Sequence, residues 1–155
     1  MLRRFTSHPA IDNHALWGPD GSRLVLNSNR NGSFDLFEKP ASGALEEKLV
    51  FASPENKFPV DWSRDGRVLL YVKQDAKTGN DISALRLDGG RKPFAVVETP
   101  FSEDEGQFSP DGQWIAYRSN ESGRQEIYVK RFPGPGGAWQ VSITILQNWT
   151  LALKK

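Results

Sequence analysis

The stretch that decides the fold is Phe108-Ser109-Pro110-Asp111-Gly112, because the chain contains its pattern three times. The pattern is an aromatic residue, two variable residues and Asp-Gly, and the other copies lie at residues 17–21 and 62–66. Successive copies are about 45 residues apart, and each is followed by a short apolar segment. A fixed period of this size is the sequence signature of a repeat architecture.

The rest of each unit consists of short segments with strand character. After the Asp-Gly turn come a buried apolar segment, a polar turn, an alternating segment and an outer apolar segment. No helical periodicity competes with this pattern. Four strands per unit predict an all-β fold, a partial β-propeller of about three four-stranded antiparallel blades. The predicted strands are 23–28, 34–38, 48–51, 67–72, 81–87, 94–97, 113–119, 126–131 and 139–141, with inner strands ending at 58–62 and 106–108.

The aspartates of the three turns, Asp20, Asp65 and Asp111, admit two interpretations: metal ligands or turn formers. In the third copy Pro110 fixes φ at the second turn position, and Gly112 suits the left-handed position that closes the hairpin. An Asp between them accepts hydrogen bonds from nearby backbone N–H groups. We therefore interpret the three aspartates as turn formers.

The aromatic residues before the turns are predicted to be core. Trp17, Trp62 and Phe108 occupy one repeat position on the innermost strand, where they would pack between neighbouring sheets. Trp114 lies on a predicted buried strand and is assigned to the core as well. The alternative, stacking platforms for nucleic acid or sugars, is less consistent with these positions.

Composition and motifs argue against several classes of function. The chain has 155 residues with 20 basic and 19 acidic side chains, so its net charge of +1 predicts no nucleic-acid partner. No apolar run is long enough to predict a membrane segment, and the absence of cysteine excludes disulfides and thiolate sites. Motifs of serine hydrolases, phosphate-binding loops and zinc proteases are absent. No catalytic, cofactor-binding or metal-binding residue is therefore predicted.

The last unit resembles a known repeat. Residues 108–129, with the Ser-Pro-Asp-Gly turn and the strand Glu-Ile-Tyr-Val, are similar to the TolB-type, WD-repeat-like β-propeller repeat. Residues 131–142 resemble the version found in bacterial propellers fused to serine/threonine protein kinases. The resemblance covers about residues 14–142. The first two units depart from it at Gly18 and Arg64, where the family favours Ser and Pro.

This resemblance implies a non-catalytic scaffold that binds a protein or peptide partner and needs no cofactor. TolB-like relatives imply a periplasmic or extracytoplasmic location, and kinase-fused relatives imply a sensory portion of a larger protein. Propellers of prolyl-oligopeptidase and dipeptidyl-peptidase-type serine hydrolases are similar too. A propeller fragment of such an enzyme is therefore the alternative.

Three units are fewer than the roughly four to eight blades that close a propeller. We therefore expect a fragment of a larger propeller, or a homodimer in which uncovered blade faces meet in a six-bladed ring. The propeller part is predicted at residues 12–142. Residues 1–11 are predicted to be a disordered arm, and residues 143–155 a truncated or frameshifted tail, because the repeat pattern ends there.

The best polar feature is a candidate binding rim at one mouth of the propeller channel. Glu103, Asp104 and Glu105 precede the third inner strand, and His14 precedes the first. Such a rim would attract a basic peptide or a cation such as Ca²⁺. The alternative is an ordinary solvated loop.

Overall fold

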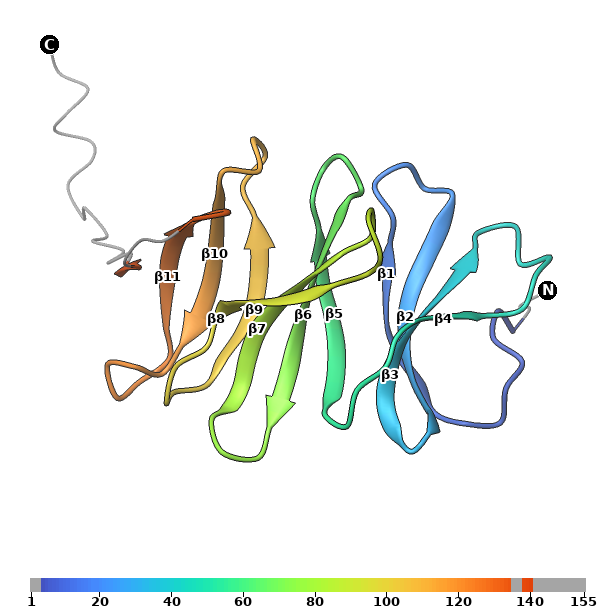
Figure 1. Ribbon diagram of the computed structural model, residues 1–155, viewed down its shortest axis with the longest axis horizontal. Helices are drawn as coiled ribbons and strands as arrows, with labels where there is room; N and C mark the ends of the chain where they lie inside the picture. The colour runs from blue at the N-terminus through green and yellow to red at the C-terminus, as the bar shows by residue number, and fades with distance from the viewer. Residues whose placement is uncertain (1–3, 135–137, 141–155) are drawn as a thin grey trace, which may run out of the picture.

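The structure is a computed structural model that describes residues 4–134 and 138–140. In this part of the chain, twelve strands form three four-stranded antiparallel sheets, and there is no helix. Figure 1 shows the three sheets side by side in chain order, as blades of a β-propeller are arranged. The predicted all-β partial propeller is confirmed. The predicted tail, residues 143–155, lies outside the described residues.

Within each blade, the strands follow one another from the inner strand to the outer strand. Blade 1 contains β1 (Asp12–Trp17), β2 (Arg23–Asn31), β3 (Ser33–Pro40) and β4 (Lys48–Phe51). Blade 2 contains β5 (Asn56–Trp62), β6 (Val68–Asp75), β7 (Gly79–Arg86) and β8 (Pro93–Val97). Blade 3 contains β9 (Glu103–Phe108), β10 (Trp114–Ser119), β11 (Glu126–Arg131) and β12 (Trp139–Gln140).

The Asp-Gly turns close the hairpin between the first and second strands of each blade. Gly112 has a φ of 70°, and its N–H donates to the carbonyl of Ser109 at 2.8 Å. The Ser109 hydroxyl and the Gln113 N–H donate to Asp111, and these bonds hold the pKa of Asp111 below its usual range. The other two aspartates accept equivalent bonds: Asp20 from Ser22, and Asp65 from Ser63 and Arg67. The interpretation of the aspartates as turn formers is confirmed.

The burial of the second strands shows which blades are covered on both faces. In β6 all residues from 68 to 72 are buried, although side chains alternate between the two faces of a sheet. In β10 burial alternates: Ile115 and Tyr117 are buried, while Trp114 and Ala116 are half-buried. Blade 2 is therefore enclosed by its neighbours, and blade 3 has one face open.

Two hydrophobic clusters join the blades, and alternate residues of β6 enter different clusters. The first cluster contains Val25, Leu36 and Val50 of blade 1 with Trp62, Leu69, Tyr71 and Leu85 of blade 2. The second contains Val68, Leu70, Ile82, Ala84, Val96 and Val97 of blade 2 with Ile115, Tyr117 and Tyr128 of blade 3. Blade 2 thus contributes one face to each of the two interfaces.

The aromatic residue before each Asp-Gly turn packs into a core cluster only where a preceding blade covers it. Trp62 is 6 % exposed in the first cluster, and Phe108 packs against the second. Trp17 occupies the same repeat position but is 58 % exposed, because no described sheet lies against that face of blade 1. The assignment of Trp17 to the core is therefore wrong. The assignment of Trp114 is wrong for the same reason, since it lies on the open face of blade 3.

Residues 4–11, part of the segment predicted to be a disordered arm, lie against blade 1 in the structure. The N–H of Ile11 donates to the side-chain oxygen of Asn29 at 3.0 Å, and the N–H of Asn29 donates back to the carbonyl of Ile11. The ring of Phe5 lies 5.2 Å from Nζ of Lys39. Disorder of the arm in solution stays a prediction.

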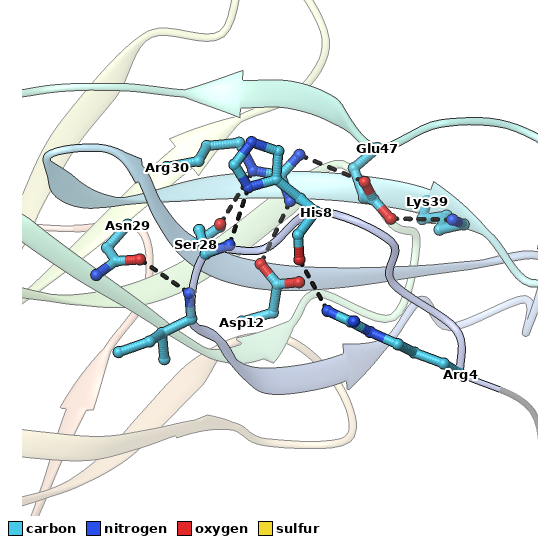
Figure 2. A network of polar contacts seen from close by, with 10 residues as sticks. Arg4, His8, Asp12, Ser28, Asn29, Arg30, Lys39 and Glu47 are labelled. Atoms are coloured by element: carbon cyan, nitrogen blue, oxygen red, sulfur yellow. Dashed lines mark hydrogen bonds and ion pairs between the residues drawn. The ribbon is translucent and has the colours of Figure 1, made fainter.

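A polar network lies where the arm meets blade 1 (Figure 2). Arg30 forms ion pairs at 3.3 Å with both Asp12 and Glu47, and Lys39 reaches Glu47 at 2.9 Å. The Arg30 guanidinium also lies over the ring of Phe37, 4.3 Å from its centroid. Charged side chains thus cover part of the face of blade 1 against which no sheet of the described residues packs.

The difference between the two tryptophans at one repeat position is testable. Trp62→Ala is expected to lower the free energy of unfolding by about 3–5 kcal/mol, because it empties a buried site between blades 1 and 2. Trp17→Ala is expected to change it by less than about 1 kcal/mol, because the indole is largely solvated. Denaturant titration, at a protein concentration at which the chain is monomeric, measures both. Equal losses would contradict the packing described here.

Candidate functional site: a groove along the inner strands

The inner strands of the three blades are neighbours, with β1 in contact with β5 and β5 in contact with β9. Together they line a groove of about 350 Å³. In a propeller the innermost strands surround the central channel, so this groove lies on the channel side. We call it the inner-strand groove, and it is lined by His14, Ala15, Leu16, Pro59, Val60, Glu105, Gly106 and Gln107.

Each inner strand carries a β-bulge at the groove. In β1 and β9, one bulge residue has a left-handed backbone: His14 with φ 50° and Glu105 with φ 54°. In β5 the corresponding residue is Pro59, whose ring fixes φ near about −65°, and the irregularity falls at Val60 instead. Left-handed non-glycine residues are uncommon, and they cluster at functional sites. Bulges next to binding sites commonly redirect a side chain.

The structure brings two of the four predicted rim residues, His14 and Glu105, to one groove. The ring of His14 packs edge-on against Phe58 of the next blade, with centroids 5.2 Å apart. Phe58 in turn contacts Phe34, with centroids 6.0 Å apart. His14 therefore presents an imidazole that is exposed but supported by an aromatic contact between blades.

Asp104 and Glu105 share one arginine. Nε and Nη2 of Arg118 donate to the two carboxylate oxygens of Asp104 at 2.7 and 2.8 Å, and Nη1 lies 3.2 Å from Oε1 of Glu105. The bond to Asp104 raises the pKa of Arg118, so the guanidinium stays charged. Two of the carboxylates predicted to attract a cation or a basic peptide are thus already paired.

Glu103, the remaining rim candidate, is not at the groove. It begins β9 and is buried between blades 2 and 3. Thr99 donates to its Oε1 at 2.5 Å and Ser119 at 3.3 Å. Burial raises the pKa of the Glu103 carboxyl, because a charged form is poorly solvated there. The acidic run is therefore the first half of an inner strand, and its side chains point to different environments.

Two contacts position β9 against blade 2. A Cβ on Gly106 would lie 3.2 Å from Cδ1 of Ile82, so the backbone of β9 approaches β7 closely. The carboxylate of Asp61 accepts a 2.7 Å hydrogen bond from the N–H of Phe108. Sequence reasoning missed Gly106 as a groove residue. The available signal was a glycine at the repeat position where the other inner strands have Ala15 and Val60.

Within residues 4–134 and 138–140, no group of three or more His, Cys, Asp or Glu side chains is placed to hold a metal ion. The Ca²⁺ option for the rim therefore has no ligand set in this part of the chain. A helix long and apolar enough to cross a membrane is also not found among the described residues.

Comparison with known proteins identifies the family. The family model described as the TolB beta propeller domain matches residues 1–128, and the chain belongs to this family. Over 122 residues the chain is 26 % identical to the uncharacterized protein Atu1656 of Agrobacterium fabrum. The match covers 75 % of this chain but 39 % of that protein, so the chain spans about two fifths of this relative's length.

Solved structures with similar folds include both TolB and enzymes. TolB from Acinetobacter baumannii superposes with a TM-score of 0.74 at 18 % identity, over 90 % of this chain and 34 % of that one. An oligogalacturonate lyase in complex with manganese gives 0.67 at 20 % identity, over 84 % and 38 % of the two chains. A prolyl endopeptidase gives 0.61 at 17 % identity, over 84 % and 22 %. At these identities the similarity shows the fold alone.

The left-handed backbone of Glu105 makes an unusual substitution favourable. Glu105→Gly is expected to leave stability unchanged or raise it by up to about 1 kcal/mol, because relief of the backbone strain offsets the lost contact with Arg118. Gln107→Gly, at an exposed residue two positions along the same strand, is expected to lower stability by about 0.5–1 kcal/mol. Denaturant titration of both variants is the measurement, and a destabilisation by Glu105→Gly as large as that by Gln107→Gly would contradict the assigned strain.

Proposed function

We propose that the chain is a non-catalytic module that binds an extended peptide segment of a protein partner in the inner-strand groove. The observation that carries the proposal is the convergence of His14 and Glu105, both left-handed and both exposed, on one groove built by three blades. Rigid sheets supply the scaffold, since most of their side chains are used for blade packing. Belonging to the TolB propeller family is consistent with such a role.

The chemistry of the groove suits a peptide that is partly apolar. Val60 and Leu16 are half-buried and offer apolar surface, while His14 and Glu105 offer polar groups at two of its three strands. A bulge leaves an extra residue outside the regular ladder of hydrogen bonds, and each inner strand has one at the groove. A segment with a small apolar residue beside a hydrogen-bonding or basic residue fits this combination.

An enzymatic role is the alternative, since a lyase and an endopeptidase have similar propellers. We favour a non-catalytic role because the sequence carries none of the hydrolase motifs and because Asp104 and Glu105 are engaged by Arg118. Assays of the purified chain with a prolyl peptide, and with oligogalacturonate plus manganese, test this. Turnover that a point substitution within the chain abolishes would overturn the non-catalytic proposal.

The resemblance of residues 131–142 to kinase-fused propellers supports a finer proposal, namely that the module is the sensory portion of a larger extracytoplasmic protein. The reading frames that flank its coding sequence are the test. Kinase motifs there would support the sensory role, and a Gly-x-Ser-x-Gly motif would favour the hydrolase alternative instead.

Peptide selection tests the groove directly. The purified chain is expected to enrich related sequences from a random peptide display library. Ala15→Trp should weaken the selected peptides at least about tenfold, because Ala15 is an exposed lining residue and an indole there would fill part of the groove.

The matched control is Ala44→Trp, an exposed position in the loop between β3 and β4 that does not line the groove. It should leave peptide affinity unchanged. Failure to enrich any related sequences, or equal weakening by both substitutions, would contradict peptide binding in the groove.

A second proposal concerns self-association through the two open blade faces. In both formed interfaces, the aromatic residue before the Asp-Gly turn packs against the preceding blade, and Trp17 is exposed at that same position. At the other end, the open face of blade 3 carries Trp114 and a 39 % exposed Ile127. Blade 1 of one copy therefore offers blade 3 of another the kind of surface that joins consecutive blades. Two such contacts would close a six-bladed ring with two-fold symmetry.

Light scattering over a range of concentrations tests the ring. A mass that approaches two chains is expected, and Trp17→Ser should shift the equilibrium toward the monomer, because it removes the aromatic group from the interface. Phe101→Ser, a substitution of an exposed aromatic residue away from both faces, should not change it. A monomer at every concentration, or equal effects of the two variants, would refute the ring.

A further inference from the structure

A buried ionisable residue occupies the same repeat position at both blade interfaces. Lys57 is the second residue of β5 and is 0 % exposed. Its Nζ lies 3.0 Å from Oδ1 of Asp35 in the preceding blade, and it also donates to the carbonyls of Ser53 and Glu55. The interface between blades 1 and 2 therefore contains a lysine–aspartate pair whose charges balance.

The interface between blades 2 and 3 carries two acids at these positions. The strand register makes Asp81 the counterpart of Asp35. Asp35 pairs with Ser28 of β2, and Asp81 pairs with Lys73, the equivalent residue of β6. Glu103 is the counterpart of Lys57. Lys57 pairs with Lys73 of β6, and Glu103 pairs with Ser119, the equivalent residue of β10. Asp81 is 0 % and Glu103 1 % exposed. A carboxyl therefore stands where the first interface has an ammonium.

Close approaches at two glycines, Gly79 and Gly106, place the two acids near each other. The start of β7 lies against the residue before β9, because a Cβ on Gly79 would be 3.7 Å from Cβ of Ser102. Further along the same strands, Gly106 lies against Ile82. Asp81 and Glu103 fall within the strip of interface between these two contacts.

Each acid has one satisfied and one unsatisfied oxygen. Oδ2 of Asp81 accepts a 2.7 Å bond from Thr78 and lies 3.5 Å from Nζ of Lys73. Oε1 of Glu103 accepts the bonds from Thr99 and Ser119. Oδ1 of Asp81 and Oε2 of Glu103 are buried and accept no hydrogen bond within the described part of the chain. Two ionised acids with such oxygens would be costly in this interface.

The surrounding charges do not neutralise Glu103. Lys73 is shared by three carboxylates, with Asp75 at 4.0 Å and Glu98 at 3.8 Å in addition to Asp81. Among the described residues no salt bridge reaches Glu103, and Arg118 is engaged by Asp104 and Glu105. The other titratable neighbours, Glu121 and Tyr117, add no positive charge.

We propose that Asp81 and Glu103 form a proton-binding site between blades 2 and 3, in which the Glu103 carboxyl holds a proton beside Asp81 and the interface weakens when that proton is released to solvent. Burial is the main reason that the Glu103 carboxyl has a raised pKa, and the neighbouring Asp81 adds to it. Because β9 also carries Glu105 and Gly106, loss of the proton would loosen one wall of the inner-strand groove.

The direction of the pH dependence follows from linkage. Between the ordinary glutamate pKa and the raised pKa of Glu103, the folded chain binds more protons than the unfolded chain. The contribution of this site to stability is therefore present at low pH and is lost as pH rises through the raised pKa. Carboxylates with lowered pKa, such as Asp111, have the opposite dependence at lower pH, so the site is isolated by comparing variants.

Melting midpoints of wild type, Glu103→Gln and Glu103→Lys, measured from about pH 5 to about pH 8, test the site. The melting midpoint of Glu103→Gln, minus that of wild type, should rise by about 3 °C or more from about pH 5 to about pH 8, because the amide cannot ionise. Glu103→Lys should gain at pH 8 as well, since it recreates the Asp35–Lys57 arrangement. Glu121→Gln, at an exposed neighbouring carboxylate, is the control and should follow wild type.

Parallel curves for wild type and Glu103→Gln would overturn the proposal. So would Ca²⁺ or Mg²⁺ stabilising wild type more than Glu103→Gln at pH 8, because the site would then take a metal ion. Carbon-detected NMR of the wild type labelled at glutamate carboxyl groups keeps the test independent of variant folding. One glutamate is expected to titrate above the ordinary range, and titration of every glutamate within that range would refute the site.

Discussion

The interaction on which the rest of the structure depends is the packing of one blade face against the next. A four-stranded sheet has two faces to cover, and of the three blades in the described part of the chain, blade 2 alone has a blade on each side. This explains why β6 is buried residue after residue while β10 alternates. It also explains why Trp62 is core and Trp17 is solvated, although both occupy the same repeat position. Whether a residue is buried therefore depends on the neighbouring blade more than on its position in the repeat.

The inner-strand groove is a consequence of that packing. Because blade faces meet, β1, β5 and β9 are brought side by side, and their bulges open on one surface. The bulges of the three strands differ in backbone conformation. His14 and Glu105 adopt a left-handed backbone, whereas Pro59 cannot. The strain at the two non-glycine positions is tolerated because contacts such as that of Gly106 with Ile82 hold the strands in place.

The same packing makes the charge of a repeat position matter. At one interface the buried position holds Lys57 opposite Asp35, and at the next it holds Glu103 opposite Asp81. The strand register is equivalent at the two interfaces, so the difference is in the ionisable groups that occupy it. Interfaces with the same backbone can therefore respond differently to pH, and the acidic one supports the third wall of the groove.

The sequence by itself determined the Asp-Gly turns, most strand positions and the number of blades, because these depend on local φ preferences and on alternation within a few residues. It also placed His14 and Glu105 on the channel side, although it could not show that they share one groove. Only the tertiary structure decided that Trp17 is exposed, that Glu103 is buried, and that Arg118 pairs with Asp104 and Glu105. Those outcomes depend on which residues of other strands and blades lie opposite, and a repeat pattern carries no information about its neighbours in space.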